Sequence, residues 1–256
     1  IEILRINLVL CFQLKWEQPL VHSSHRNFRP VDVRMGPDGA VYIVDWYNPI
    51  PCHQDDRYRD PRRDKAHGRI WRVSSDRPTV DFPDLKKSTT QQVAQALASP
   101  ERWTRYQAKR EITCRDDSEV TRALKNWIRQ LDPRDEQYEF HLVQALGAFA
   151  TIEVPNRSLL VRLLEAKDPR ARALACRVAG RWQDRLDDAT ELLASRTSDS
   201  QIQVRMEAVA AASQLTDSRA ITTIARAFDF PVDGALDYVI NQAIRHTARF
   251  WESRIG

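Results

Sequence analysis

The chain has 256 residues, and its 39 Lys and Arg against 35 Asp and Glu leave a formal net charge of +4. That length is enough for one or two domains with their own cores. No apolar run approaches the roughly 18–20 residues of a membrane-spanning helix, so we expect no transmembrane segment. The two signs of charge are interspersed, and the excess therefore does not point to nucleic acid as a partner.

The four cysteines lie far apart and form no Cys-x-x-Cys pair, which argues against a metal site or a disulfide framework. We expect isolated, mostly buried thiols and no metal. They are Cys11, Cys52, Cys114 and Cys176.

Residues 1–78 have the pattern of β-strands. Residues 3–14 are apolar and β-branched, and residues 31–35 alternate as a half-buried strand does. The turn Gly36-Pro37-Asp38-Gly39 connects the latter to a return strand over 40–46, and residues 68–73 form a further strand. Because the start has neither an initiator Met nor a signal-peptide cleavage pattern, we expect this chain to be part of a longer protein.

The polar loop of residues 47–68 is where chemistry would lie, since loops of this length are usually functional or disordered. His67, next to Gly68 at the start of a strand, is the candidate catalytic base. Asp45, His53 and Arg69 are the candidates for cofactor binding. The alternative, which we favour, is that alternating Asp and Arg form a salt-bridged structural loop.

Residues 79–88 break the strand pattern, and Ser88 with Gln91 fits a capping box that begins the first helix. From there the sequence repeats with steps of 34, 33, 33 and 33 residues. A repeat of this length with two helices predicts a solenoid, so residues 89–252 should form about ten helices in antiparallel pairs. The equivalent positions are Arg105, Glu139, Arg172, Arg205 and Tyr238.

The repeat starts follow the Asp-Pro-x-x-Arg pattern of short HEAT repeats, as in "KDPRARA". Proline suits the first helical turn and Asp before it caps the helix. The Arg can pair with the cap Asp of its own or the neighbouring repeat. We expect four tryptophans to fill gaps between the helix layers, and their spacing does not favour base stacking. They are Trp103, Trp127, Trp182 and Trp251.

The segments "FRPVDVRMGPDGAVYIVDWYNP" and "HGRIWR" together resemble the end of the β-propeller in sorbosone-dehydrogenase-like proteins, in particular the membrane-bound dehydrogenases of planctomycetes. In that family a quinoprotein-type propeller precedes HEAT repeats and often a c-type haem domain. The resemblance implies a parent that oxidises a sugar or alcohol with PQQ and calcium, passes electrons to haem c, and is periplasmic or exported. This chain has no Cys-x-x-Cys-His, so the haem domain is missing from it, and we expect the fragment to hold no cofactor.

We therefore expect an α+β, mostly α protein with a partial antiparallel β-propeller blade or blades and an α-solenoid of HEAT-like helix pairs. The domains are a propeller fragment over 1–78, a linker over 79–88 and the solenoid over 89–256. The solenoid would be a scaffold or spacer toward a redox domain, in a chain that is inactive alone. The alternative is a non-catalytic adaptor that binds a protein partner.

The connection between the two halves should be a packed elbow. Phe82 and Leu85 are expected to be buried between the sheet and the first helix pair. The Arg-rich segment 57–72 should lie near this junction and pair with acidic residues of the first repeats.

Overall fold

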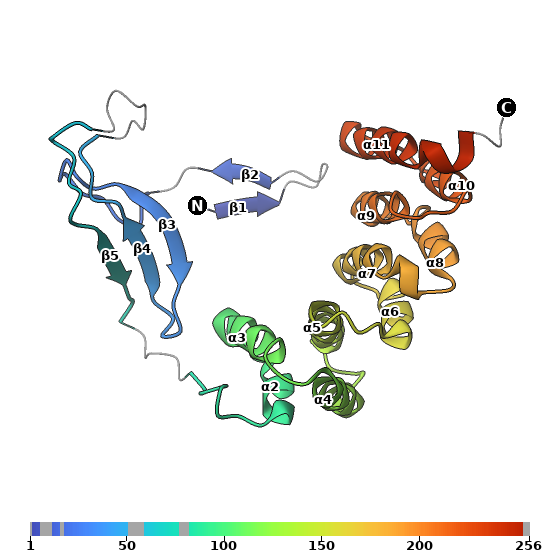
Figure 1. The fold of residues 1–256 in the computed structure, drawn as a ribbon, viewed down its shortest axis with the longest axis horizontal. Coiled ribbons are helices and arrows are strands. Elements are labelled where there is room, and N and C mark those ends of the chain that lie inside the picture. Colours follow the sequence, from blue (N-terminus) through green and yellow to red (C-terminus); the bar gives the residue numbers. More distant parts are fainter. Residues whose placement is uncertain (1, 6–11, 16–17, 51–58, 77–81, 253–256) are drawn as a thin grey trace.

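The computed structural model describes residues 2–5, 12–15, 18–50, 59–76 and 82–252. In this part of the chain, short β-strands come first and a curved array of helices follows (Figure 1). No helix of the described part is long and apolar enough to cross a membrane.

The strands form two separate antiparallel sheets. The hairpin of β1 (Glu2–Arg5) and β2 (Phe12–Lys15) is one, and the other has the order β3 (Pro30–Met35), β4 (Val41–Asp45), β5 (Arg69–Val73). The predicted antiparallel strands are therefore present, but what they form among the described residues is a small three-stranded sheet and a hairpin, and no propeller is shown.

The turn between β3 and β4 uses its two glycines differently. Gly39 has a positive φ of 74°. This backbone conformation is strained for residues with a Cβ, and glycine adopts it without that strain. Gly36 does not have positive φ, but a Cβ there would lie 2.2 Å from the ring of Tyr42. The Tyr42 hydroxyl donates to Asp38 at 3.1 Å, so the close approach of ring and backbone fixes the turn.

One face of the three-stranded sheet is apolar and largely uncovered. Strand pairing places Val33 opposite Ile43 and Ile43 opposite Trp71, and side chains in register share a face. Ile43 is buried in the central strand, but Val33 is 58% and Trp71 39% exposed on the outer strands. An apolar sheet face of this kind is normally covered by another layer.

The helical region confirms the prediction of about ten helices, since the described residues contain ten α-helices and two short 3-10 turns. The helices are α2 (Thr90–Ala96), α3 (Arg102–Ile112), α4 (Asp117–Gln130), α5 (Tyr138–Thr151), α6 (Arg157–Leu164), α7 (Pro169–Arg181), α8 (Ala189–Arg196), α9 (Ile202–Ala212), α10 (Ala220–Ala225) and α11 (Gly234–Trp251).

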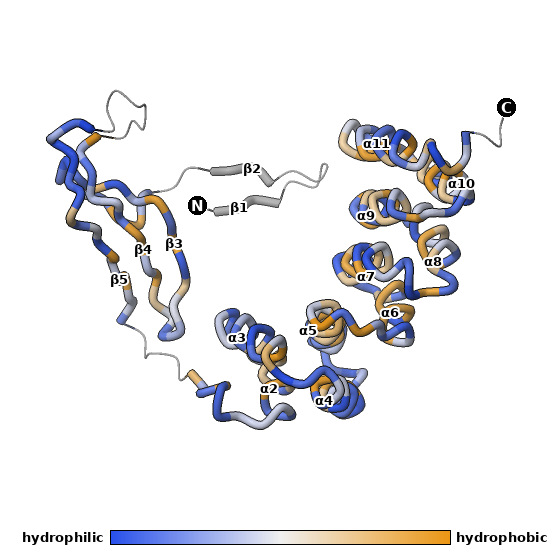
Figure 2. Tube along the Cα trace, in the orientation of Figure 1, coloured by the Kyte–Doolittle hydropathy of each residue, from blue (hydrophilic) through white to orange (hydrophobic). Residues whose placement is uncertain are grey.

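The helices stack in two layers. Odd-numbered helices line the inside of the arc and even-numbered helices the outside (Figure 1). One buried apolar cluster extends from Leu85 to Ala243 between the layers. Each helix carries both hydrophobic and hydrophilic residues (Figure 2). Stacking of neighbours into a continuous core is what defines an α-solenoid.

The first helix begins one residue later than predicted. Thr89 and Gln92 form the capping box: the Thr89 hydroxyl accepts from the Gln92 N–H at 3.2 Å and the Gln92 side chain accepts from the Thr89 N–H at 2.8 Å. The Ser88 hydroxyl instead donates to the Asp84 carbonyl in the preceding turn.

Leu85 is buried as predicted, although not between the sheet and the helices, whereas Phe82 is not buried. Leu85 is 4% exposed, but it packs into the helical core, where Arg115 donates to its carbonyl at 2.9 Å. Phe82 is 36% exposed, with its ring 6.4 Å from that of Trp103. The connection is therefore anchored to the helices at Leu85, whereas Phe82, three residues earlier, lies at the surface.

Neighbouring inner helices approach each other unequally. A Cβ on Gly180 of α7 would lie 2.8 Å from the Cβ and 2.9 Å from the Cα of Ala211 in α9, so these backbones are in direct contact. A Cβ on Gly147 of α5 would meet only the Lys109 amine of α3, at 3.7 Å. The same residue type thus has a packing role in one helix and none in the other.

This difference predicts opposite effects of one substitution. Gly180→Ala should destabilise the array by about 1–3 kcal/mol because α7 and α9 must separate. Gly147→Ala, the matched control, should be neutral or stabilise by up to about 1 kcal/mol, since alanine favours helix and has room. Urea unfolding followed by circular dichroism measures both. Equal effects of the two substitutions would contradict the contact at Gly180.

Candidate functional site

Asp45 is the centre of the hydrogen-bond network in the β region. Its carboxylate is buried and accepts from the backbone N–H groups of Arg29 at 2.8 Å and Tyr47 at 2.9 Å. The second oxygen accepts from Arg69 Nε at 3.0 Å and Trp71 Nε1 at 2.9 Å. Burial raises the pKa of Asp45, but these donors outweigh it and the pKa is lowered overall. Through these four hydrogen bonds, the Asp45 carboxylate links β4 to β5 and to Arg29, the residue before β3.

Tyr47, two residues after Asp45, has a positive φ of 53°. Two histidine rings and an arginine side chain lie around its ring. The Arg69 guanidinium lies 4.0 Å from its ring centre. The ring of His25 stacks at 5.6 Å and that of His67 meets it edge-on at 6.4 Å. The candidates Asp45, Arg69 and His67 are therefore brought together around Tyr47, whereas His53 lies outside the described residues.

His67 is tied to Asp64 and open to water. Its ring Nδ1 lies 2.9 Å from Asp64 Oδ2, and its backbone N–H donates to Asp64 Oδ1 at 3.0 Å. The N–H of Ala66 and the ring of His67 lower the pKa of Asp64. The side chain of His67 is 72% exposed, so solvent screens its pair with Asp64. The catalytic role of His67 stays a prediction.

Three arginines of the Arg-rich segment, Arg62, Arg69 and Arg72, form ion pairs inside the β region. Arg62 pairs with Asp60 at 2.7 Å and Arg72 with Asp38 at 2.7 Å. Arg63 lies 5.6 Å from the Trp46 ring centre. These partners differ from the predicted acidic residues of the first repeats, because aspartates adjacent in the sheet and its turns are closer.

The described residues do not fit the calcium and PQQ site that the resemblance implies. Within them no group of three or more His, Cys, Asp or Glu side chains could hold a metal ion. The carboxylate of Asp45 already has four donors. We therefore derive no chemical step through a quinone.

Two cysteines can be described. Cys114 is exposed, and Cys176 is buried in α7, where burial raises the pKa of its thiol to about 12. A thiol with that pKa is protonated at neutral pH and unreactive. Both cysteines are far from Tyr47 in the sequence, and Cys176 belongs to the helical core.

The equivalent arginines of the helical repeat bind the connection that precedes their own helix. Each donates through Nη1 to the carbonyls six and five residues before it. These carbonyls belong to Ser99 and Pro100 for Arg105, to Ala166 and Lys167 for Arg172, and to Asp199 and Ser200 for Arg205, at distances between 2.7 and 3.4 Å. The repeated hydrogen bonds fix the turn before each inner helix.

The same positions also bind the next repeat. Arg172 donates to both carboxylate oxygens of Asp199 at 2.8 and 3.0 Å. Arg205 donates to the Pro231 carbonyl at 2.6 Å. Glu139 has the complementary role, because its carboxylate accepts from the N–H of the next connection at Lys167 (2.8 Å) and Asp168 (2.9 Å). We call this set of contacts the Arg ladder.

The inside of the arc presents a second candidate site. We define the inner face as the exposed or half-exposed side chains of the odd-numbered helices, which line the inside of the arc, where these side chains line grooves or pair with a neighbouring odd-numbered helix. Its members are Arg102, Tyr106, Arg110, Phe140, Val143, Arg170, Arg177, Ala210, Tyr238, Gln242, Arg245 and His246. Cations and aromatic rings are therefore mixed on one continuous surface.

The cations of the inner face are of two kinds. In the middle of the array, Arg177 pairs with Glu207 and Arg170 with Asp168. Toward the ends, Arg102, Arg110 and Arg245 have no ion pair within the described residues. Positive charge without a carboxylate partner is thus concentrated near α3 and α11.

This surface was not predicted from the sequence. Of the four tryptophans expected in the core, Trp127 and Trp182 are buried and Trp103 and Trp251 are half-buried, and no surface role was predicted for the exposed rings of Tyr106, Phe140 and Tyr238. The available signal was the spacing of Arg102, Tyr106 and Arg110, four residues apart and thus on one side of α3.

Fold and site together define a helical-repeat protein with a small β region. The family model for HEAT repeats matches residues 156–245, and a domain of unknown function, DUF7133, matches residues 13–77. The α-solenoid of the second half is thus similar to HEAT repeats, as predicted. The dehydrogenase parent has no support from these matches.

No curated protein matches this chain. Among solved structures, an engineered protein of the Northeast Structural Genomics Consortium is 18% identical, with 62% of this chain and 79% of that chain covered and a TM-score of 0.40. The crystal structure of Cex1p is 13% identical and covers 65% of this chain, with a TM-score of 0.45. The match spans 37% of the Cex1p chain.

The Arg ladder predicts a large effect at Asp199. Asp199→Asn should destabilise the array by about 3 kcal/mol, because it leaves the buried Arg172 without its carboxylate. Asp217→Asn removes the more exposed pair with Arg219 and should cost less than about 1 kcal/mol. Urea unfolding compares the two variants, and a loss at Asp217 as large as at Asp199 would contradict this ranking.

The same carboxylate gives a pH dependence. Burial raises the pKa of Asp199, but the Arg172 side chain and the Gln201 N–H lower it more, so its folded-state pKa is depressed. Its contribution is therefore complete above about pH 4, the ordinary pKa of aspartate, and is lost as pH falls through the folded value. Asp199→Asn should make unfolding less dependent on pH below about 4 than in the unchanged chain.

Proposed function

We propose that this chain is an interaction scaffold whose inner face binds a protein partner. The observation that supports this most directly is the inner face itself, where exposed Tyr106 and Tyr238 lie among arginines without carboxylate partners in the described residues. Tyr and Arg are enriched at the energetic centres of protein interfaces. The match to HEAT repeats, which typically act as interaction modules, agrees with this role.

A rigid surface suits such a role. The Arg ladder fixes each connection to the next through contacts such as Arg172 with Asp199 and Arg205 with Pro231. Side chains on the inner face are therefore held at set spacings before a partner arrives. Preorganisation of this kind reduces the conformational entropy that binding would otherwise lose.

The test uses a photo-cross-linking residue on either side of the array. With the residue at Tyr106 on the inner face, the protein expressed in its native cells should cross-link to one protein that mass spectrometry identifies. With the residue at Glu119, exposed on the outer helix α4, that cross-link should be absent. Equal cross-linking at both positions, or at Glu119 alone, would rule out the inner face as the binding surface.

A second candidate function rests on the uncovered apolar face of the sheet. Val33, Met35 and Trp71 are exposed there, and β3 and β5 both have free edges within the described residues. Blades of a propeller cover such faces with one another. This supports the proposal that domain 1–78 is the end of a propeller in a sugar or alcohol dehydrogenase-like parent. PQQ with calcium would bind elsewhere in that parent, haem c in a further domain, and the location would be periplasmic or exported.

In that second function, the linker 79–88 and the solenoid 89–256 would space the propeller from the redox domain. The parent protein, supplied with PQQ and calcium, should reduce a dye in the presence of sugars, whereas this chain alone should not. A parent that stays inactive with PQQ, calcium and a panel of sugars and alcohols would remove this candidate and leave the scaffold proposal untouched.

A further inference from the structure

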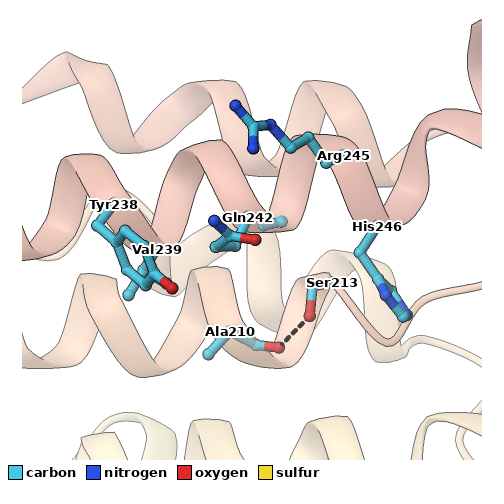
Figure 3. A pocket seen from close by; sticks show the side chains of 8 residues that line it. Ala210, Ser213, Tyr238, Val239, Gln242, Arg245 and His246 are labelled. Carbon is cyan, nitrogen blue, oxygen red and sulfur yellow. Dashed lines mark hydrogen bonds between the residues drawn. The ribbon is translucent and has the colours of Figure 1, made fainter.

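The last two inner helices, α9 and α11, enclose a groove within the inner face, and the scaffold function does not specify its ligand. It opens on the inner face and has a volume of about 460 Å³ (Figure 3). We call it the α9–α11 groove. Its principal lining residues are Ala210, Ser213, Tyr238, Gln242, Arg245 and His246.

The groove has an apolar end and a basic end. Figure 3 shows Tyr238 and Val239 at one end and the His246 ring at the other, while the Arg245 side chain extends over the opposite side of α11 toward Gln242. The Ser213 hydroxyl donates to the Ala210 carbonyl at 2.7 Å, so this side chain is turned back onto its own helix. Small side chains therefore line the α9 side, and only the α11 side offers charge.

Tyr238, at one end of the groove, departs from the Arg ladder. Tyr238 stands at the repeat position of Arg105, Arg172 and Arg205, whose side chains reach back to the preceding connection. A tyrosine lacks the guanidinium for those hydrogen bonds, and its side chain is 64% exposed on the inner face instead. This aromatic ring therefore has no partner in the ladder.

The basic end lacks a carboxylate partner. Arg245 and His246 have no hydrogen bond or ion pair within the described residues. The nearest acidic positions on these helices are engaged, since Glu207 pairs with Arg177 and Asp237 accepts from Asn241 at 3.2 Å. Arg245 is therefore exposed to solvent and free to pair with a carboxylate of a ligand.

We propose that the α9–α11 groove binds a short acidic segment of the partner protein. An apolar side chain of the segment packs against Tyr238 and Ala210, one carboxylate accepts from His246, and another pairs with Arg245 along α11. The volume suits a few side chains, in the range of ordinary ligand sites. A peptide is favoured over nucleic acid, because phosphates require a track of cations whereas this groove has an apolar half. The inference rests on the proposed scaffold function and specifies its partner's chemistry.

The probe is a fluorescein-labelled peptide, Glu-Phe-Asp-Glu-Leu-Asp, measured by anisotropy against the full chain at low salt. Its control is the amide version, Gln-Phe-Asn-Gln-Leu-Asn. The acidic probe should bind with a Kd on the order of 10–100 µM, the range of a small, few-contact site, and the amide probe at least about tenfold more weakly. Equal affinities, or no binding of the acidic probe at 1 mM (about a tenfold excess over that range), would overturn the proposal.

Two variants separate charge from shape. Arg245→Glu reverses the cation, and Ala210→Trp fills the groove from an exposed position of α9. Each should weaken the acidic probe by about tenfold or more, while Arg226→Glu, an exposed arginine following α10, should change it by less than about twofold. Circular dichroism confirms that the helices remain. Full binding by both groove variants would place the probe elsewhere and overturn the proposal.

An oligothymidine strand, added as competitor, addresses the nucleic-acid alternative. Tighter binding of this strand than of the acidic peptide, lost in Arg245→Glu, would overturn the peptide proposal. Cross-links at Tyr106 that persist in Ala210→Trp, together with failure of the probe, would leave the scaffold function standing and reject only the acidic-segment assignment.

Discussion

The Arg172–Asp199 pair is the contact on which the helical array depends. A turn between two helices leaves carbonyl and N–H groups without partners, and burial of such groups is costly. Arg172 donates to carbonyls of its own turn and to the Asp199 carboxylate, while Asp199 also accepts from the Gln201 N–H in the turn before α9. One largely buried ion pair thus satisfies polar groups of two successive connections and links α7 to the turn before α9.

The β region solves a similar problem with Asp45. It accepts from two backbone and two side-chain donors, including Arg69 and Trp71. In each region a buried carboxylate is hydrogen-bonded to groups of the fold, so it is not available to bind a partner. What remains available is cationic and aromatic: Tyr47 with its histidines in the sheet, and the inner face in the array. This division separates the residues that hold the fold from those that can meet a partner.

Sequence periodicity was sufficient for the array because a repeat every 33–34 residues has one structural solution, a stacked helix pair. Local competition was harder to foresee. Thr89 and not Ser88 caps the first helix, while Ser88 donates to the preceding turn at Asp84, and Phe82 stays exposed while Leu85 enters the core. The α9–α11 groove could not be read from sequence, since it depends on where the Tyr238 side chain points. The apolar alternation of β3 and β4 predicted the sheet, but the sequence alone could not say what covers it.

Gly180 and Gly147 give the array a mechanical asymmetry. The α7 and α9 backbones touch at Gly180, so this joint has short, dense dispersion contacts and resists bending. Between α3 and α5 the Lys109 amine lies against Gly147 without a partner in the described residues, and burial, with the charge of Arg105, lowers its pKa. Under a pulling force, the α3–α5 joint should therefore yield first, and the array would act as a stiff C-terminal rod on a softer N-terminal hinge.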